Sequence, residues 1–381
     1  MVVLVSNDLA HDQRVAKTCQ TLEKDGWEVF LIGRLLSDSQ PMKTARLHHR
    51  IALPFQKGVW FYASLQIALF WKLLWLPYDA IWANDLDTLL PASLMKFIRS
   101  KPVIYDSHEF FTEAAGLTGR GFQRSVWLAL EAWLLPRTKA VITVNDSIAD
   151  AYRERYPKSL CGRPIVVRNM PVLQPRQERD DRVWEEFNIP CQRPIFILQG
   201  AFLDQDRGVR EAVQALRTIQ QGTLVVVGAG SEFDWAQEQV ASLRGRLHCL
   251  PKLPFESLRK LTASADIGLS LDRGVHGNYW MSLPNKLFDY IHAGIPVVAS
   301  PMPEVERVVT EWNVGAIIED HEPESIAQAI HQVLQLHHSE WGERCDSASR
   351  HLNWEAEEPK IFRALEMAGL RIRRQPASLI S

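Results

Sequence analysis

Short apolar runs alternate with helical segments along almost the whole chain, and this alternation restricts the possible folds more than any other feature. A short apolar run between two helices is typical of an inner strand of a parallel sheet, because helices cover both faces of such a sheet. The pattern therefore predicts an α/β protein with doubly wound, Rossmann-like parallel sheets. The predicted strands are residues 2–5, 27–32, 78–83, 102–105, 140–144, 164–168, 195–198, 223–227, 247–250, 267–270, 297–299 and 315–318. The predicted helices are residues 13–25, 59–75, 89–98, 121–135, 145–156, 210–220, 232–243, 255–263, 285–292, 303–310, 323–336 and 354–368.

One stretch with two prolines and no apolar periodicity, residues 169–181, interrupts the alternation and is typical of a linker. With 381 residues the chain is long enough for two domains. We therefore expect an N-terminal domain over residues 1–168 and a C-terminal domain over residues 182–350. The final helix, within residues 351–381, has no strand after it and is expected to cross back to the N-terminal domain. Two such domains would face a cleft at the carboxyl ends of their strands, where ligands bind in sheets of this kind.

Composition excludes several classes of partner and site. The formal net charge is −2, so no overall field attracts nucleic acid, and we expect no nucleic-acid partner. The five cysteines are far apart and form no Cys-x-x-Cys pair, which argues against a zinc site or a disulfide framework and suits a reducing cytosol. The N-terminus has no signal-peptide pattern, so we expect a cytoplasmic protein.

The segment 59–76, VWFYASLQIALFWKLLWL, is rich in tryptophan and almost long enough to span a bilayer. Ser64, Gln66 and Lys72 interrupt its apolar sequence, and Pro77 follows it at once. These residues favour a largely buried helix of a soluble domain. A helix lying in the membrane interface is the second interpretation, and a membrane-spanning helix is the least favoured.

The stretch 282–300, SLPNKLFDYIHAGIPVVAS, predicts a loop, a helix and a buried strand. Pro284 suits the start of the helix, and Gly294 suits its end. Lys286 and Asp289 lie near a helix N-terminus, which favours anions. A carboxylate and a cation at this position indicate a site for a ligand with both hydroxyls and phosphates. The alternative is an ordinary crossover whose polar residues are merely solvated.

Two glycine-containing loops follow predicted strands. The loop 199–208 begins with Gly200 and ends beside Arg207, and its backbone N–H groups with the guanidinium suit a diphosphate. A surface loop with a solvated arginine is the equal alternative. The segment 225–233, VVVGAGSEF, lacks the third glycine of a dinucleotide fingerprint, so we interpret Gly228 as part of a tight turn whose backbone lines the cleft.

Polar residues also follow the predicted strands of the N-terminal half. His108 stands at a strand end facing the predicted cleft, where a histidine can donate, accept or transfer a proton; the alternative is a structural histidine in a helix cap. Asp85 and Asp87 could hold a metal, but a loop or capping role is favoured. Asp12 and Arg14 either face the cleft or form an internal salt bridge.

Taken together, these segments resemble the GT-B glycosyltransferases, specifically the retaining enzymes of glycosyltransferase family 4. The resemblance covers almost the whole chain. The segments that carry it are HDQRV, ANDLDTLLP, YDSHEFFTE, VITVNDSIAD, VVRNMP, LQGAFLDQDRG, VVVGAGSE, LPNKLFDYIHAGIPVVAS and NWEAEEPKI.

The resemblance also shows where this chain departs from its family. The family usually carries two glutamates separated by seven residues, and the second binds the ribose hydroxyls of the nucleotide. Asp289 stands at the second position, and Met281 stands at the first. On the donor diphosphate the family often uses an arginine and a lysine; Arg207 matches the lysine, but Ala201 falls at the arginine. We expect Lys286 to supply the missing charge.

The resemblance implies transfer of a sugar from a nucleotide-diphosphate donor to an acceptor hydroxyl with retention, in the synthesis of cell-surface polysaccharide or glycolipid. It implies no cofactor and no metal, a carbohydrate or lipid-linked acceptor, and peripheral attachment to the inner face of the plasma membrane. The candidate catalytic residues are His108, Arg207 and Lys286. The candidate donor-binding residues are Gly200, Arg207, Gly228, Asn285, Lys286 and Asp289. Two alternatives stay open: a sugar-nucleotide epimerase of the same fold, and a non-catalytic, membrane-associated assembly partner.

Overall fold

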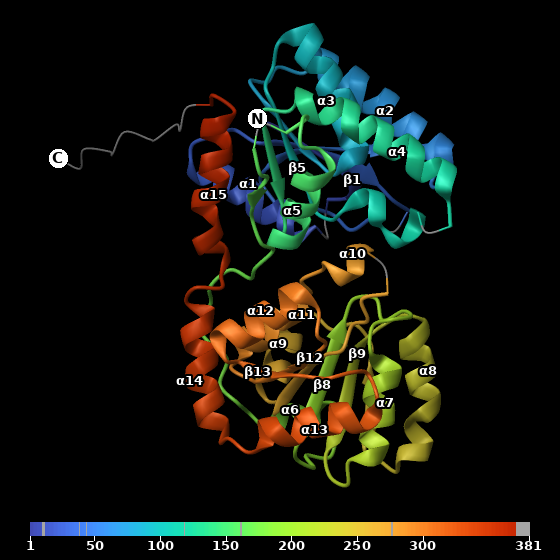
Figure 1. The fold of residues 1–381 in the computed structure, drawn as a ribbon, viewed down its shortest axis with the longest axis vertical. Helices are drawn as coiled ribbons and strands as arrows, with labels where there is room; N and C mark the ends of the chain where they lie inside the picture. The colour runs from blue at the N-terminus through green and yellow to red at the C-terminus, as the bar shows by residue number, and fades with distance from the viewer. Residues whose placement is uncertain are drawn as a thin grey trace, which may run out of the picture. The chain divides into compact units, whose positions relative to one another are not determined.

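The computed structural model describes residues 1–9, 12–37, 39–42, 44–117, 119–160, 162–275 and 277–370. The chain divides into two compact units (Figure 1). Unit 1 combines Met1–Asn169 with the chain from Glu357 onward, and unit 2 is Met170–Ala356. Of the residues singled out in the sequence, His11 of the first motif, Cys161 and residues 371–381 lie outside the described residues.

Unit 1 is built on a seven-stranded parallel sheet with the strand order β3-β2-β1-β4-β5-β6-β7. The order reverses between β1 and β4, so the sheet is doubly wound, as the sequence predicts. The strands are β1 (Val2–Asp8), β2 (Phe30–Leu35), β3 (Leu47–Ala52), β4 (Ile81–Asn84), β5 (Val103–Ser107), β6 (Ala140–Thr143) and β7 (Ile165–Val166). Residues of β4 and β6 are buried throughout, because helices cover both faces of these strands.

Side-chain caps begin the helices that follow β1 and β6. Asp12 caps the first helix by accepting a hydrogen bond from the N–H of Val15 at 3.0 Å, and Asn145 accepts one from the N–H of Ile148 at 2.9 Å. The helices are α1 (Gln13–Lys24), α2 (Gly58–Trp75), α3 (Leu86–Arg99), α4 (Gly121–Leu134), α5 (Asp146–Arg155) and α15 (Trp354–Met367), with short 3-10 turns at Phe111–Glu113, Ala115–Leu117 and Leu135–Arg137.

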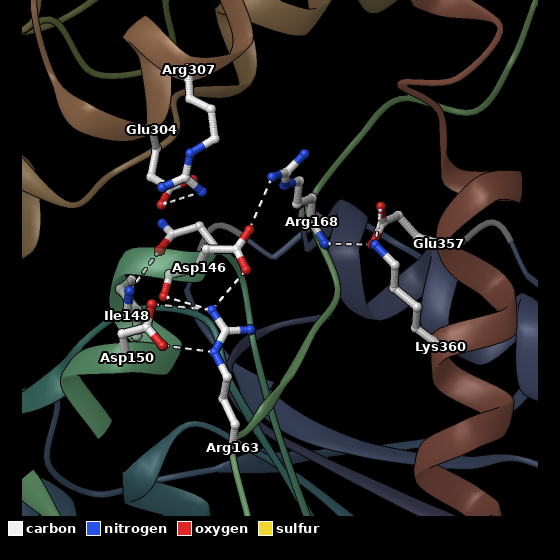
Figure 2. A network of polar contacts seen from close by, with 10 residues as sticks. Asp146, Ile148, Asp150, Arg163, Arg168, Glu304, Arg307, Glu357 and Lys360 are labelled. Atoms are coloured by element: carbon white, nitrogen blue, oxygen red, sulfur yellow. Dashed lines mark hydrogen bonds and ion pairs between the residues drawn. The ribbon is translucent and has the colours of Figure 1, made fainter. Parts of the chain in front are cut away.

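The glutamates of α15 attach this helix to unit 1. The Glu358 carboxylate accepts hydrogen bonds from Thr21 at 2.9 Å and Lys24 at 2.7 Å, both on α1. Glu357 accepts one from the backbone N–H of Arg168 at 2.9 Å (Figure 2). Figure 2 also shows the Arg168 guanidinium facing the Asp146 carboxylate at the start of α5. The two groups lie 3.1 Å apart. Through these contacts the last helix packs with the beginning and the end of the N-terminal half.

Unit 2 holds a six-stranded parallel sheet with the order β10-β9-β8-β11-β12-β13. Its strands are β8 (Ile195–Gly200), β9 (Thr223–Gly228), β10 (Leu247–Leu250), β11 (Ile267–Ser270), β12 (Val297–Ala299) and β13 (Gly315–Ile317). Side chains alternate between the two faces, so Phe196 and Leu198 join one apolar cluster while Ile195 and Ile197 join the other. The two clusters are the two halves of a doubly wound core.

Along the chain, the helices of unit 2 precede, separate and follow these strands. They are α6 (Arg182–Glu186), α7 (Val209–Thr218), α8 (Ser231–Gln239), α9 (Phe255–Ala263), α10 (Gly277–Trp280), α11 (Asn285–Ala293), α12 (Pro303–Trp312), α13 (Pro323–Leu334) and α14 (His338–Ser349), with a 3-10 turn at Val240–Leu243. The stretch interpreted as a linker also contacts this unit, because the Arg179 guanidinium lies 2.7 Å from the Asp266 carboxylate.

The expectation of a largely buried helix over residues 59–76 is wrong. Helix α2 buries one face through Phe61, Leu65, Leu69 and Leu73. Its other face is exposed, although it is also apolar: Trp71 is 55% exposed and Trp75 is 78% exposed. Apolar residues on both faces made the helix look buried in the sequence. In the part of the chain that the structure describes, no helix is both long and apolar enough to cross a membrane.

Candidate functional site

In unit 2 the strand order reverses between β8 and β11, and ligands of such sheets bind outside the strand ends at this point. The loops that follow β8 and β11 therefore leave the sheet side by side. Arg207, in the first loop, donates a hydrogen bond from Nη1 to Oδ1 of Asp272 in the second loop, at 3.2 Å. A cation and a buried carboxylate thus meet at the place where a ligand is expected.

The backbone of the two loops is fixed close to this pair. The N–H of Arg273 donates to the carbonyl of Asp206 at 2.9 Å. Gly208 adopts φ +78, and a Cβ atom there would lie 2.4 Å from the carbonyl oxygen of Leu271. Only glycine permits both this conformation and this close approach. The contact keeps Arg207 opposite Asp272.

Lys286, on the first turn of α11, brings a second cation to the same carboxylate. Its Nζ lies 3.0 Å from Oδ2 of Asp272, and Lys286 is 9% exposed. The two atoms are close enough for an ion pair, but neither has a hydrogen bond of acceptable geometry in the described structure. A buried ammonium that lacks such hydrogen bonds can bind a further anion once its Nζ is uncovered.

An aromatic ring completes the surroundings of Arg207. The guanidinium carbon lies 4.6 Å from the centre of the Tyr279 ring, and Nη2 lies 3.4 Å from the tyrosine hydroxyl. The guanidinium lies between a ring and a carboxylate, and the Arg207 side chain is still 31% exposed. Arg207 is therefore oriented by the protein and open to a ligand.

Asp289, one turn along α11 from Lys286, lies beside the end of β8. Its Oδ2 accepts a hydrogen bond from Nε2 of Gln199 at 3.0 Å, and Oε1 of Gln199 accepts one from Thr262 at 2.8 Å. Gln199 is only 4% exposed, so it orients a carboxylate that is itself partly exposed. Asn285, the first residue of α11, is exposed.

Gly200 and Gly228 end the neighbouring strands β8 and β9. A Cβ atom on Gly228 would lie 2.1 Å from the carbonyl oxygen of Gly200, and its φ is +157. This close approach of two backbones requires a glycine at residue 228. A cavity of about 260 Å³ in unit 2 lies elsewhere, at the start of β13, where Gln332, Trp341 and Arg344 line it.

In unit 1 the corresponding strand ends carry a buried network around His108. Its Nε2 lies 3.0 Å from Oδ1 of Asn84 and 3.8 Å from Oδ2 of Asp106, and its Nδ1 lies 3.6 Å from Oδ2 of Asp85. The backbone N–H of His108 also donates to Oδ1 of Asp85 at 2.9 Å. Burial opposes a charged imidazole, but the two aspartates outweigh it and raise the pKa of His108 to about 9. His108 is therefore a cation at neutral pH.

Arg14 forms the internal salt bridge that one interpretation of the sequence foresees. Its Nη2 donates to Oδ1 of Asp106 at 2.7 Å, and its Nη1 donates to the carbonyl of Val167 at 2.7 Å. Nε1 of Trp82 donates to the other oxygen of Asp106 at 3.3 Å. Burial disfavours the ionised carboxyl, but Arg14 and His108 lower the pKa of Asp106 below its usual value. Asp12 caps α1 instead.

Asp87 has a different environment. It is 6% exposed at the start of α3, and burial together with the nearby Asp85 raises its pKa to about 7. Among the described residues, no group of three or more histidine, cysteine, aspartate or glutamate side chains is arranged to hold a metal ion. The Asp85 side chain does not cap α3, although a loop or capping role was expected for it. It accepts a hydrogen bond from the backbone N–H of His108 instead.

Solved structures share this fold over almost their whole length. A sucrose-phosphate synthase from Thermosynechococcus elongatus matches with a TM-score of 0.76 and 17% identity, covering 96% of this chain and 98% of that one. HepE from Anabaena, in complex with UDP, matches with a TM-score of 0.70 and 16% identity over 96% and 99% of the two chains. WaaG, described as a glycosyltransferase involved in lipopolysaccharide biosynthesis, matches with a TM-score of 0.69 and 16% identity over 97% and 99%. At these identities the likeness shows the GT-B fold.

Two family models match the two halves of the chain. The model for the glycosyl transferase 4-like domain matches residues 11–161, and the model for glycosyl transferases group 1 matches residues 193–336. The chain is a GT-B glycosyltransferase. No curated protein matches it by sequence. The fold and the family expected from the sequence are both confirmed.

The structure of this glycosyltransferase brings some of the predicted site residues together. Arg207 and Lys286 share one carboxylate, and Asp289 lies on the same helix as Lys286. His108 lies in unit 1, in its own network. The roles given to these residues stay predictions.

Sequence reasoning missed Asp272 and Gln199. Asp272 follows directly after an apolar strand, which is the signal that drew attention to His108 in unit 1. Applying that signal to every strand end would have found it. Gln199 is the next-to-last residue of β8, and nothing in the sequence distinguishes it from an ordinary strand residue.

Replacing His108 with glutamine is expected to lower stability by on the order of 2 kcal/mol at pH 6. The folded-state pKa of about 9 lies above the ordinary value of 6.5, so the charged imidazole makes its full contribution to the stability of the fold below pH 6.5. This contribution is lost as the pH rises through 9, and the variant should then approach the wild type. Chemical denaturation at pH 6 and pH 9.5 measures the difference.

His49→Gln on β3 is the matched control. Partial burial and the nearby Lys72 lower the pKa of His49. The stability of the wild type relative to His49→Gln should therefore rise with pH, whereas its stability relative to His108→Gln should fall. An equal effect of His108→Gln at both pH values would contradict the charge assigned to His108.

Proposed function

We propose that this glycosyltransferase moves a sugar from a nucleotide-diphosphate donor to an acceptor hydroxyl and retains the anomeric configuration. One observation carries the proposal: Arg207 and the buried Lys286 lie together at the switch point of the unit 2 sheet. A reaction that releases an anionic diphosphate needs fixed cations where the charge develops. These two side chains supply such cations without a metal, so we propose a metal-independent reaction with no cofactor.

Each group has a proposed part in the donor site. The bond between the anomeric carbon and the diphosphate oxygen breaks while the acceptor oxygen bonds to that carbon, and the acceptor proton passes to the leaving diphosphate. Arg207 and Lys286 stabilise the negative charge that develops on the diphosphate. The partly exposed carboxylate of Asp289 suits the ribose hydroxyls, and Gln199 holds it in place. The backbones of Gly200 and Gly228 at the strand ends, with Asn285 at the start of α11, line the site.

His108 is proposed to donate a hydrogen bond to the donor sugar or the acceptor. A pKa of about 9 leaves it protonated at neutral pH, so it is a donor and not a general base. HepE structures carry UDP, UDP with glucose, and UDP-glucose, which makes UDP-glucose the first donor to test.

The acceptor is proposed to be a carbohydrate or a lipid-linked sugar in cell-surface polysaccharide or glycolipid synthesis. WaaG, which shares the fold, is described as acting in lipopolysaccharide biosynthesis. Because such an acceptor is attached to a lipid, we also propose that the enzyme works at the cytoplasmic face of the membrane. Unit 1 has a surface that suits this position.

Two exposed apolar rows of unit 1, one on α2 and one on α4, are together called the outer face. Figure 1 shows α2, α3 and α4 gathered in unit 1, and Tyr62 of α2 contacts Trp127 of α4 with ring centres 5.0 Å apart. Helix α3 is mostly buried, and α2 and α4 each turn an apolar row to the solvent. The exposed residues of the outer face are Trp60, Ile67, Trp71 and Trp75 on α2 and Phe122, Val126 and Trp133 on α4.

The charges around the outer face favour an anionic lipid surface. No aspartate or glutamate occurs between Asp38 and Asp79, whereas α2 is flanked and interrupted by Lys57 and Lys72. On α4 the single carboxylate, Glu131, is fully buried and accepts hydrogen bonds from two tyrosines, at 2.9 Å and 2.6 Å. Exposed tryptophans with cations and without exposed carboxylates suit the interface of a membrane with anionic lipids.

Incubation with a panel of nucleotide sugars, with and without a chelator, tests the reaction. One donor should stabilise the protein against heat and be slowly hydrolysed, and the chelator should leave both effects unchanged. Conversion of the donor into another nucleotide sugar would identify an epimerase instead. Lack of binding to every nucleotide sugar would contradict the proposed donor and support an assembly partner.

Arg207→Ala is expected to weaken binding of UDP-glucose by about tenfold or more, because a charge-assisted contact to phosphate contributes roughly 1.5–3 kcal/mol. Isothermal titration calorimetry measures the affinity. The matched control is Arg210→Ala, which removes a nearby arginine that pairs with Glu232 at 2.6 Å. Equal affinity of the Arg207 variant and the wild type would remove Arg207 from the donor site.

Co-sedimentation with vesicles tests the outer face. The wild type should bind phosphatidylcholine vesicles that contain phosphatidylglycerol, and more salt should weaken binding. Changing Trp60, Trp71 and Trp75 to serine together should weaken it by about tenfold or more. Phe255→Ser, an exposed aromatic residue of unit 2, should have no effect. Complete recovery of the wild type in the soluble fraction would contradict membrane attachment.

A further inference from the structure

We propose that Asp272 competes with the donor diphosphate for Arg207 and Lys286 and thereby sets how tightly the nucleotide diphosphate is held. The inference rests on the proposed role of these two cations. It adds Asp272 to the site. Asp272 weakens binding of the diphosphate, whereas Arg207 and Lys286 strengthen it.

The geometry of the carboxylate is that of a bridging anion. Oδ1 lies 3.2 Å from Nη1 of Arg207, and Oδ2 lies 3.0 Å from Nζ of Lys286. Each oxygen thus contacts a different cation, as the oxygens of a diphosphate would. Asp272 is 3% exposed, so water screens these contacts little.

The two contacts differ in quality. The bond from Arg207 meets the geometry of a hydrogen bond, whereas Nζ of Lys286 and Oδ2 of Asp272 meet only the distance of an ion pair. The ammonium therefore keeps hydrogen-bonding capacity, but its Nζ is buried, so a phosphate oxygen uses it only by displacing the side chains that cover it, Asp272 among them. The Arg207 side chain is 31% exposed, so it is also open to this ligand.

The backbone prevents Asp272 from moving far away. The contact of Gly208 with Leu271 and the bond from Arg273 to Asp206 fix the loop on both sides of it. Its negative charge therefore stays near any anion bound to the two cations and repels it. The repulsion weakens binding of the diphosphate and favours release of the nucleotide product, a step that limits the turnover of many enzymes.

The other interpretation is a purely structural ion pair. In that case, removing the carboxylate charge would loosen Arg207 and Lys286 and weaken anion binding. Under our proposal it strengthens anion binding. The sign of the change in affinity distinguishes the two, and loss of stability does not, because both interpretations predict it.

The experiment compares Asp272→Asn with Asp266→Asn by isothermal titration calorimetry. Asp266 precedes the same strand, β11, at its other end, and it also contacts two cations, Arg193 and Arg179, each at 2.7 Å. The probes are UDP and inorganic pyrophosphate, with a chelator present. Asp272→Asn should bind both probes about tenfold more tightly, and Asp266→Asn should bind them as the wild type does.

Unchanged or weaker binding of both probes by Asp272→Asn would overturn the inference, and so would a failure of pyrophosphate to bind the wild type and this variant. Pyrophosphate lacks the nucleoside and separates the inference from the proposed donor. If pyrophosphate binds more tightly to Asp272→Asn while no nucleotide binds either protein, the inference stands and the nucleotide donor is wrong.

Discussion

Parallel pairing of the strands is the constraint on which both units depend. Because every strand of a sheet points the same way, all carboxyl ends meet at one edge, and the loops that leave this edge come together. Arg207 and Asp272 are 65 residues apart in the chain and 3.2 Å apart in space for this reason. The close approach of Gly208 to Leu271 then determines which side chains face each other.

The inner strands could be predicted from the sequence because burial on both faces requires continuous apolar runs. Strand β3, Leu47–Ala52, could not, because it is an exposed edge strand with the sequence LHHRIA. The prediction that α2 is largely buried was wrong for a related reason. A sequence shows that a helix face is apolar, but it does not show whether protein covers that face.

The candidate site was partly predictable on the same grounds. Arg207 and Lys286 could be proposed as site residues from the sequence, because a glycine loop and a helix start are local signals typical of anion sites. Asp272 was missed because its importance comes from contacts with residues distant in sequence. The partners of His108 were missed likewise: Asn84 ends another strand, β4, and Asp85 follows it, and both reach His108 only through the pairing of β4 with β5.

The two strand-end networks differ in charge, and the difference fits the proposed reaction. Around His108, two cations face two carboxylates, because Arg14 pairs with Asp106 and Asp85 lies beside the imidazole. Around Asp272, two cations face one carboxylate. A balanced network suits a neutral sugar, whose hydroxyls need hydrogen bonds and no net charge. An excess of positive charge suits a diphosphate, and under our proposal the single carboxylate of Asp272 shortens the time for which that diphosphate stays bound.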